Sequence, residues 1–314
     1  MVSSEASTIQ AERKRPSDSV LAGTLVVMLV LWSFNYLAAK VALRYLDPGT
    51  LVPLRMVSSA ILIAPLYFAH RTRVPVRRKD LGTFFFLGIF GVLLNQGLFT
   101  IGINYTTSQH AVIIIAFGPV LVLLLAIAMK IEFFTVPRLL GMLISIAGIL
   151  VLEADHGASA HLPYLKGDLI GLGGVASYAI YAVYGKKVVH EFGAITMNSF
   201  NVFAAAILML PFAIWKGAHL NWASIGWQGW VGMLYMAGAS TVAAYTLFYW
   251  ILRYMEASRV AALNYFQPLM VVIIGILFLH EEPTRNMLAA GVLVILGVYL
   301  AERGKSERVE VAEE

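Results

Sequence analysis

Long apolar stretches, separated by short polar segments, follow one another along almost the whole chain. They cover residues 20–43, 50–69, 81–103, 108–129, 136–152, 167–184, 195–215, 228–250, 260–279 and 285–300. A helix needs about 17–25 apolar residues to cross the hydrocarbon core of a bilayer, and each stretch is close to that length. Backbone amides in hydrocarbon must pair within their own segment, and the strict alternation of barrel strands is lacking. The pattern therefore predicts an all-α integral membrane protein with ten transmembrane helices.

The composition leaves little material for anything outside the membrane. Of the 314 residues, 59% are hydrophobic and only 13% are charged, whereas a soluble domain carries about 25% charged residues. A large water-soluble catalytic domain is therefore excluded. The absence of cysteine from the sequence also excludes a disulfide framework, a thiolate zinc site and a cysteine nucleophile. We expect no cofactor, no metal and no enzymatic activity.

The basic residues are distributed as topology signals. Seventeen of the 23 Lys and Arg residues lie in the N-terminal tail, in alternate connectors and in the C-terminal tail, and four lie in the other connectors. The positive-inside rule then places both termini in the cytoplasm, and an even number of spans agrees with this. The net charge of +5 is therefore explained by these topology signals, and we expect no binding to nucleic acid. The remaining two, Lys40 and Arg55, fall within apolar stretches.

The two halves of the chain resemble one another. A shift of 149 residues aligns Tyr105 with Tyr254, Pro119 with Pro268, Glu132 with Glu281 and Gly148 with Gly297, and a shift of 146 aligns Lys40 with Lys186 and Pro65 with Pro211. Each half then holds five spans, and because five is odd the halves are inverted. We expect a tail over 1–19, a five-helix repeat over 20–153, an external linker over 154–166, a second repeat over 167–302 and a tail over 303–314.

Several motifs in these spans resemble one transporter family. They are WSFNYLAAK at 32–40, PLR at 53–55, YTTSQHAVIIIAFGP at 105–119, the SRVAALNYFQP core within 254–282 with the LHEE that follows, and GVLVILG at 291–297. In this order the chain is similar to the EamA branch of the drug/metabolite transporter superfamily over 20–302. The resemblance implies a bacterial inner-membrane exporter of amino acids or related metabolites, with aromatic amino acid exporters of the YddG kind as one subgroup. Tyr178 stands where such proteins often carry tryptophan, a departure that bears on substrate preference.

Polar and aromatic residues inside the spans are the candidates for substrate binding. They are Trp32, Asn35, Lys40, Asn95, Gln96, Tyr178, Tyr181, Tyr245, Asn264 and Gln267. Neutral amides can hydrogen-bond a zwitterion without the desolvation cost of a buried charge, and aromatic rings suit a flat apolar side chain. The alternatives are hydrogen bonds between helices for the amides, interfacial belts for the aromatics and snorkelling to the interface for Lys40.

Arg55, Pro119 and Pro268 are candidates for gating or hinge residues. Arg55 lies one turn into the second span, where it either snorkels to headgroups or binds a substrate carboxylate in an outer vestibule. The two prolines lie near the middle of corresponding spans, and each removes an internal hydrogen bond and permits a kink. Matched kinks would suit two halves that rock, although proline is also common in ordinary membrane helices.

No carboxylate lies in mid-membrane, so a proton relay cannot be identified from the sequence. Glu132 and Glu281 come nearest, at the ends of their spans, where we interpret them as interface or capping groups. The sequence therefore favours a secondary transporter that works by alternating access, with small-molecule substrate and membrane lipid as its partners and a monomer as one option. Export of cationic drugs or other metabolites is the alternative within this class. A passive pore and an intramembrane enzyme are alternatives of other classes.

Overall fold

The computed structural model describes residues 16–70, 74–105, 114–115, 117–154, 165–267, 269–270 and 285–303, and these residues form helices and short turns with no strand. The first half contains α2 (Asp18–Ala42), α3 (Pro48–Ala69), η1 (Arg78–Asp80), α4 (Leu81–Gly88), η2 (Ile89–Leu94), α5 (Asn95–Tyr105), α7 (Gly118–Ala128) and α8 (Val136–Ala154). The second half contains α9 (Leu165–Phe192), α10 (Ala194–Ala218), η4 (Trp222–Ser224), α11 (Trp227–Leu234), η5 (Tyr235–Ala244), α12 (Tyr245–Leu252), α13 (Ala257–Leu263) and α15 (Arg285–Arg303).

Five of the described helical segments are long and apolar enough to cross a membrane. They span residues 18–42, 48–69, 78–105, 194–218 and 227–252, and shorter apolar helices cover 118–128, 136–151 and 289–301. The all-helical membrane architecture expected from the sequence is thus confirmed. The count of ten spans stays a prediction, because residues 106–113 and 271–284 lie outside the described part of the chain.

One helix continues about two turns beyond its apolar stretch. The sixth apolar stretch ends at Tyr184, but α9 continues to Phe192. A helix does not have to end where the apolar residues end, because its polar last turns can extend into water. The chain turns at Gly193, whose φ of 82° lies in the left-handed region that only glycine enters without strain. Gly193 therefore allows α10 to begin at Ala194, directly after the turn.

The third and eighth spans each contain a π-helical segment at a corresponding place. η2 covers Ile89–Leu94 and η5 covers Tyr235–Ala244. The shift of 146 residues that relates the earlier spans of the two halves places Ile89 on Tyr235. π-helical turns are rare and are frequent at functional sites. Both spans are therefore widened near their middle, where a substrate path would run.

The fourth and ninth spans are both interrupted one turn before a proline. α7 begins only at Gly118, after a turn at Phe117. α13 ends at Leu263, and the carbonyl of Asn264 accepts from the backbone N–H of Gln267 at 2.9 Å instead of from a residue four positions on. The ring of a proline clashes with the carbonyl four residues earlier, which is that of Ile115 for Pro119 and of Asn264 for Pro268. The interruptions thus follow from the sequence.

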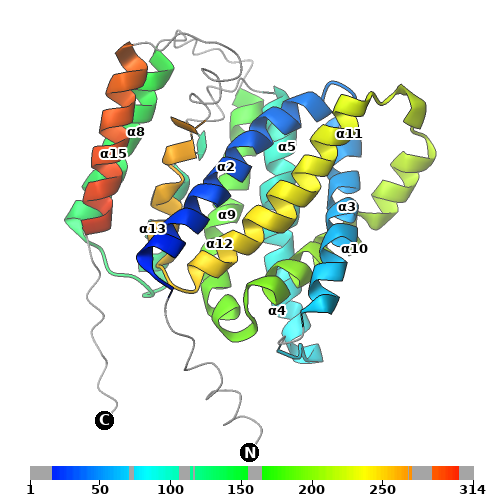
Figure 1. Ribbon diagram of the computed structural model, residues 1–314, viewed down its shortest axis with the longest axis horizontal. Helices are drawn as coiled ribbons and strands as arrows, with labels where there is room; N and C mark the ends of the chain where they lie inside the picture. The colour runs from blue at the N-terminus through cyan, green and yellow to red at the C-terminus, as the bar shows by residue number, and fades with distance from the viewer. Residues whose placement is uncertain are drawn as a thin grey trace, which may run out of the picture.

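Each span of the first half packs mainly against a span of the second half. α2 lies against α11, η5 and α12, α3 against α10, α5 against α9, α7 against α13, and α8 against α15. α2 begins and α15 ends on the same side of the bundle, and α8 and α15 stand together at its edge (Figure 1). The core therefore forms between the two halves, and any cavity within it has walls from both.

Glycines bring α8 and α15 into close contact. A Cβ added to Gly141 would lie 2.4 Å from the carbonyl oxygen of Gly297, and one added to Gly148 would lie 2.9 Å from the Cβ of Leu293. Small residues allow helix backbones in a membrane to approach and gain dispersion contacts. α8 and α15 therefore pack tightly against each other, and no described residue of either helix lines the central cavity.

Candidate functional site

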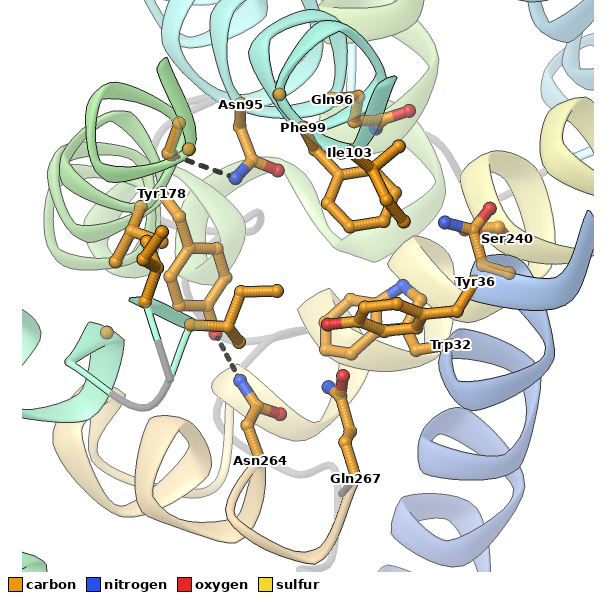
Figure 2. Close-up of a pocket in the computed structure, with 18 of the residues that line it drawn as sticks. Trp32, Tyr36, Asn95, Gln96, Phe99, Ile103, Tyr178, Ser240, Asn264 and Gln267 are labelled. Atoms are coloured by element: carbon orange, nitrogen blue, oxygen red, sulfur yellow. Dashed lines mark hydrogen bonds between the residues drawn. The ribbon is translucent and has the colours of Figure 1, made fainter. Parts of the chain in front are cut away.

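A cavity opens at the centre of the bundle between the two halves. Its empty volume is about 940 Å³ including the part open to its mouth, and its lining is mainly apolar with a few polar groups, as in small-molecule sites. The polar and aromatic residues that line it are Trp32, Asn35, Tyr36, Arg55, Asn95, Gln96, Phe99, Tyr178, Ser240, Tyr245, Asn264 and Gln267. They come from α2, α3, α5, α9, η5, α12 and the turn after α13, and Figure 2 shows several of them facing one open space.

The cavity lies toward the side of the bundle away from the described chain ends. Gly102 and Ile103 line it near the end of α5, and Gly167 and Gly171 line it near the start of α9. Those glycines also set the distance between the two helices, since a Cβ on Gly102 would lie 3.2 Å from the carbonyl oxygen of Gly167. Gly167 and Gly171 thus form a small-residue packing face against α5.

Aromatic rings form one wall of the cavity. The rings of Tyr36 and Phe99 meet edge to face with centroids 5.2 Å apart, and Trp32 meets Tyr245 at 5.1 Å. Tyr178 faces them from α9, across the open space (Figure 2). Rings at this spacing are in direct edge-to-face contact, so together they form an apolar surface that suits a flat apolar group.

Side-chain amides tie the helices around the cavity to one another. Asn95 donates from Nδ2 to the carbonyl of Gly174 at 3.0 Å and accepts at Oδ1 from the hydroxyl of Tyr245 at 2.7 Å. Asn264 donates to the hydroxyl oxygen of Tyr178 at 3.2 Å. The amides thus serve as hydrogen bonds between helices, which was the alternative to substrate binding, and they line the cavity as well.

Several buried polar atoms on the cavity wall lack a partner. The indole N–H of Trp32, Nε of Arg55 and Nε2 of Gln96 are unused donors, and Oδ1 of Asn35 and Oδ1 of Asn264 are unused acceptors. Buried polar groups in folded proteins are hydrogen-bonded in the great majority of cases. Such a group of unpaired atoms around one cavity is what a site for a polar ligand presents.

Arg55 does not snorkel to the interface, so that interpretation of the sequence is wrong. Its side chain turns into the bundle and is 2% exposed. The guanidinium donates to Oγ1 of Thr241 at 3.1 Å and to Oγ1 of Thr100 at 3.5 Å. The bundle offers hydroxyl groups at this depth, and the position of α3 against α5 and η5 points the side chain toward them rather than toward lipid headgroups.

A cluster of buried aromatic rings closes the cavity on the side of the chain ends. The ring of Tyr181 stacks on Phe248 with centroids 6.3 Å apart and meets Tyr249 at 5.2 Å. Tyr181 also lies against Gly91 in η2, where an added Cβ would come within 1.9 Å of the ring. Tyr181 was expected to contact substrate, but it is fully buried and belongs to this floor rather than to the wall.

Eight of the ten expected substrate-binding residues line the cavity, and Lys40 and Tyr181 do not. Lys40 lies on the exposed face of α2 near its end. Pro119 lines the cavity from the first turn of α7, where its missing N–H removes no internal hydrogen bond. The hinge role of Pro119 stays a prediction, because residues 106–113 and 116 lie outside the described part of the chain. Pro268 lies outside the described residues.

Four polar or aromatic side chains of the wall were not among the expected substrate-binding residues. Tyr36 could have been found, because it follows Trp32 by four positions and shares its helix face. Phe99 likewise follows Asn95 by four. The sequence held no such signal for Ser240, and for Arg55 it left both the interface and a substrate carboxylate open, because the orientation of each depends on how α3 and η5 pack.

A separate buried ion cluster joins the two halves on the side of the chain ends. Arg138 in α8 pairs with Glu132 at 3.1 Å and with Glu256 at 2.5 Å. Glu132 also accepts from the hydroxyl and, at 3.3 Å, from the backbone N–H of Ser258 in the first turn of α13. The capping interpretation of Glu132 is thereby confirmed in an unexpected form, because the helix that it caps belongs to the other half. Glu281 lies outside the described residues.

Comparison with known proteins finds one family over nearly the whole chain. The model of the EamA-like transporter family matches residues 21–153 and 165–302. An uncharacterized transporter of Archaeoglobus fulgidus is 26% identical over 89% of this chain and 97% of its own length. A protein of Salmonella typhimurium described as a probable amino-acid metabolite efflux pump is 24% identical over 88% of this chain and 92% of its own.

A solved crystal structure shares the fold. It superimposes with a TM-score of 0.71 at 17% sequence identity and covers 92% of this chain and 100% of that one. The similarity in structure therefore extends well beyond what the sequences alone retain.

Proposed function

Because this chain belongs to the EamA-like transporter family, we propose that it is a secondary transporter that exports small metabolites across a bacterial inner membrane by alternating access. Amino acids with aromatic or other apolar side chains are the substrates that we favour. The observation that carries the proposal is the central cavity, whose walls come from both halves and combine unpaired polar atoms with aromatic rings. The protein is a carrier and not an enzyme.

The two halves act as inverted five-helix repeats. In support, the family model matches twice, and the π-helical segments and the interrupted spans recur at corresponding positions. Inverted repeats are related by a pseudo-two-fold axis in the membrane plane. If the two halves exchange conformations, an opening on one side of the membrane becomes an opening on the other side. The interruptions before Pro119 and Pro268 are the hinges of this motion.

We propose ten spans with both termini in the cytoplasm. The cavity, which lies away from the chain ends, then faces the outside, and the aromatic floor beneath it closes the cytoplasmic side. The described arrangement is thus the outward-facing state. Lys40, near the external end of α2, lies outside the cavity and acts only on substrate that is entering or leaving.

The cavity fits an amino acid with an apolar side chain. The amides of Asn35, Asn95 and Gln267 present neutral donors and acceptors, and the rings of Trp32 and Tyr178 offer apolar faces. A relative described as an amino-acid metabolite efflux pump supports the same class. Substrate and lipid are the only partners that a single chain with two halves requires, so we propose that the monomer is sufficient.

Counterflow in proteoliposomes tests the proposal. Vesicles loaded with an unlabelled amino acid should take up the same labelled compound transiently and saturably, with and without a pH gradient. Linear, non-saturable flux would indicate a pore, and silence toward amino acids with uptake of organic cations would indicate a drug exporter. The chemical identity of the compound recovered would expose any enzymatic conversion.

A single substitution links transport to the cavity. Gln267→Leu should abolish counterflow while leaving expression and melting temperature intact, because Gln267 lines the cavity and its side chain makes no hydrogen bond to another described residue. Gln228→Leu, at an exposed position in α11, is the matched control and should transport normally. Normal counterflow by Gln267→Leu would remove that residue from the site.

A further inference from the structure

The cavity wall contains one buried charge that nothing in the described structure neutralises. Arg55 is 2% exposed, and its guanidinium contacts only the hydroxyls of Thr241 and Thr100. No Asp or Glu stands among the described residues that line the cavity, and no described carboxylate pairs with Arg55. The guanidinium keeps its charge in proteins and carries five N–H donors. Only two of these donors make hydrogen bonds to described residues, so most of its hydrogen-bonding capacity is unused.

An uncompensated charge at this depth is unfavourable. Removing an ion from water costs several kcal/mol even after relaxation of the protein, and two hydroxyl dipoles offset only part of that cost. An ionisable residue inside a membrane span faces a pathway or a partner in almost every case. The geometry therefore calls for an anion that arrives from outside the chain.

A second donor lies beside the guanidinium. Oγ1 of Thr241 accepts from Arg55, and its proton has two acceptors within reach, Oε1 of Gln96 at 2.8 Å and the backbone carbonyl of Met236 at 2.9 Å. This hydroxyl holds the Gln96 amide next to Arg55, and Nε2 of that amide has no partner. A carboxylate has two oxygens and binds most strongly to paired donors, of which a guanidinium is the best suited.

The opposite side of the cavity offers acceptors instead. Oδ1 of Asn264 is buried without a partner, and Asn264 lies across the open space from Gln96 (Figure 2). Elsewhere on the wall, Oδ1 of Asn35 in α2 is also an unused acceptor. An ammonium group donates hydrogen bonds to such oxygens and is attracted by the faces of nearby aromatic rings.

We infer that Arg55 and Gln96 bind the carboxylate of the substrate, and that its amino group lies toward Asn264. The inference rests on the proposed function and deepens it, because it makes a carboxylate the required group and gives the substrate one orientation in the cavity. Arg55 then determines specificity, and it rejects organic cations because the charge of the empty cavity repels them. Thr241 is a positioning residue that holds the two donors together.

The test compares ligands that differ by one group. The purified protein in nanodiscs is titrated with phenylalanine, 3-phenylpropionate and phenethylamine, and with leucine, 4-methylpentanoate and isopentylamine, while tryptophan fluorescence and melting temperature are followed. We expect the compounds with a carboxylate to bind, and those that lack it to bind roughly a hundredfold more weakly. Equal or tighter binding of the amines, or no binding by any carboxylate, would overturn the inference.

Variants separate a binding role from a structural one. Arg55→Met should raise the melting temperature of the empty protein, because it removes an unpaired buried charge, and it should abolish the rise that phenylalanine causes. A lower melting temperature with the phenylalanine effect retained would overturn the inference in favour of a structural role. Thr241→Val should weaken phenylalanine binding without changing the fold. Arg44→Met, at an exposed arginine, is the control and should change neither property.

Failure of the inference and failure of the proposed function give different results. Counterflow of phenethylamine but not of phenylalanine would reject the carboxylate anchor and leave a carrier in place. Linear flux of all six compounds, or counterflow of none, would reject the carrier of apolar amino acids and the anchor together.

Discussion

Tyr245 and Asn95 are each the first residue after a π-helical segment, one in each half of the chain, and the hydroxyl of Tyr245 donates to Oδ1 of Asn95 across 2.7 Å. This bond joins the third and eighth spans at the cavity wall. The same side chains also face the open space. The bond therefore both joins the two helices and forms part of the cavity wall.

Tyr245→Phe should weaken both the fold and transport. The change leaves Oδ1 of Asn95 without its donor, and a buried unsatisfied group costs about 1–3 kcal/mol. Unfolding by SDS titration of Tyr245→Phe, Asn95→Ala and the double variant should give a coupling energy of about 0.6 kcal/mol, the average for interhelical hydrogen bonds in a membrane. A coupling of zero would show that the two side chains do not interact in the folded protein.

Gly91→Ala should strongly destabilise the protein. A Cβ at this position would lie 1.9 Å from the ring of Tyr181, which is fully buried in the aromatic floor and has no free space to enter. Overpacking of a core commonly costs about 1–3 kcal/mol. The melting temperature measures the effect, and Gly23→Ala, where nothing lies within 4 Å, is the matched control. Equal melting temperatures for the two variants would contradict the described packing of Tyr181.

Arg138→Met should destabilise the protein more than Glu132→Gln does. Loss of the arginine leaves Glu132 and Glu256 facing one another without a cation, and breaking a buried ion pair costs about 3–5 kcal/mol. Glu132→Gln keeps an acceptor for Ser258 and loses only the charge. Melting temperatures measure both effects, with Lys79→Met at an exposed lysine as the control. The reverse order of the two variants would contradict the described cluster.

Gly171→Val should block transport without unfolding the protein. A Cβ at Gly171 would make only ordinary contact, 3.5 Å from Ile114, and it would project from a residue that lines the cavity. The added methyl groups should therefore occupy substrate space rather than collide with the backbone. Counterflow and melting temperature separate these two effects. Gly291→Val, where nothing lies within 4 Å, should leave both unchanged, and normal counterflow by Gly171→Val would place the substrate elsewhere.

The sequence predicted the helices well because hydropathy is a local property of each segment. It also predicted Asn95, Gln96, Asn264 and Gln267 as site residues, since uncharged amides in mid-membrane need partners and few places supply them. Proline sterics explain why the fourth and ninth spans are interrupted. The sequence alone did not predict that each interruption lies one turn before its proline.

Arg55 and Tyr181 show where the sequence was insufficient. Both lie in apolar stretches, and the direction of a side chain around a helix depends on which neighbours pack against it. Arg55 turned inward because Thr100 and Thr241 lie there, and Tyr181 was buried because η2 presents a glycine to its ring. The periodicity of a single helix contains neither fact, and the π-helical turns themselves leave no pattern that composition or hydropathy can detect.

The two π-helical segments give the third and eighth spans room to lose one residue each. A π-turn accommodates one residue more than an α-turn. Loss of a single residue from Ile89–Leu94 would therefore restore a regular α-turn and leave Asn95 and Phe99 on the same face of the span relative to α4. Loss of a residue from a regular α-helix would instead rotate everything beyond it by about 100°, which would turn a cavity face toward lipid.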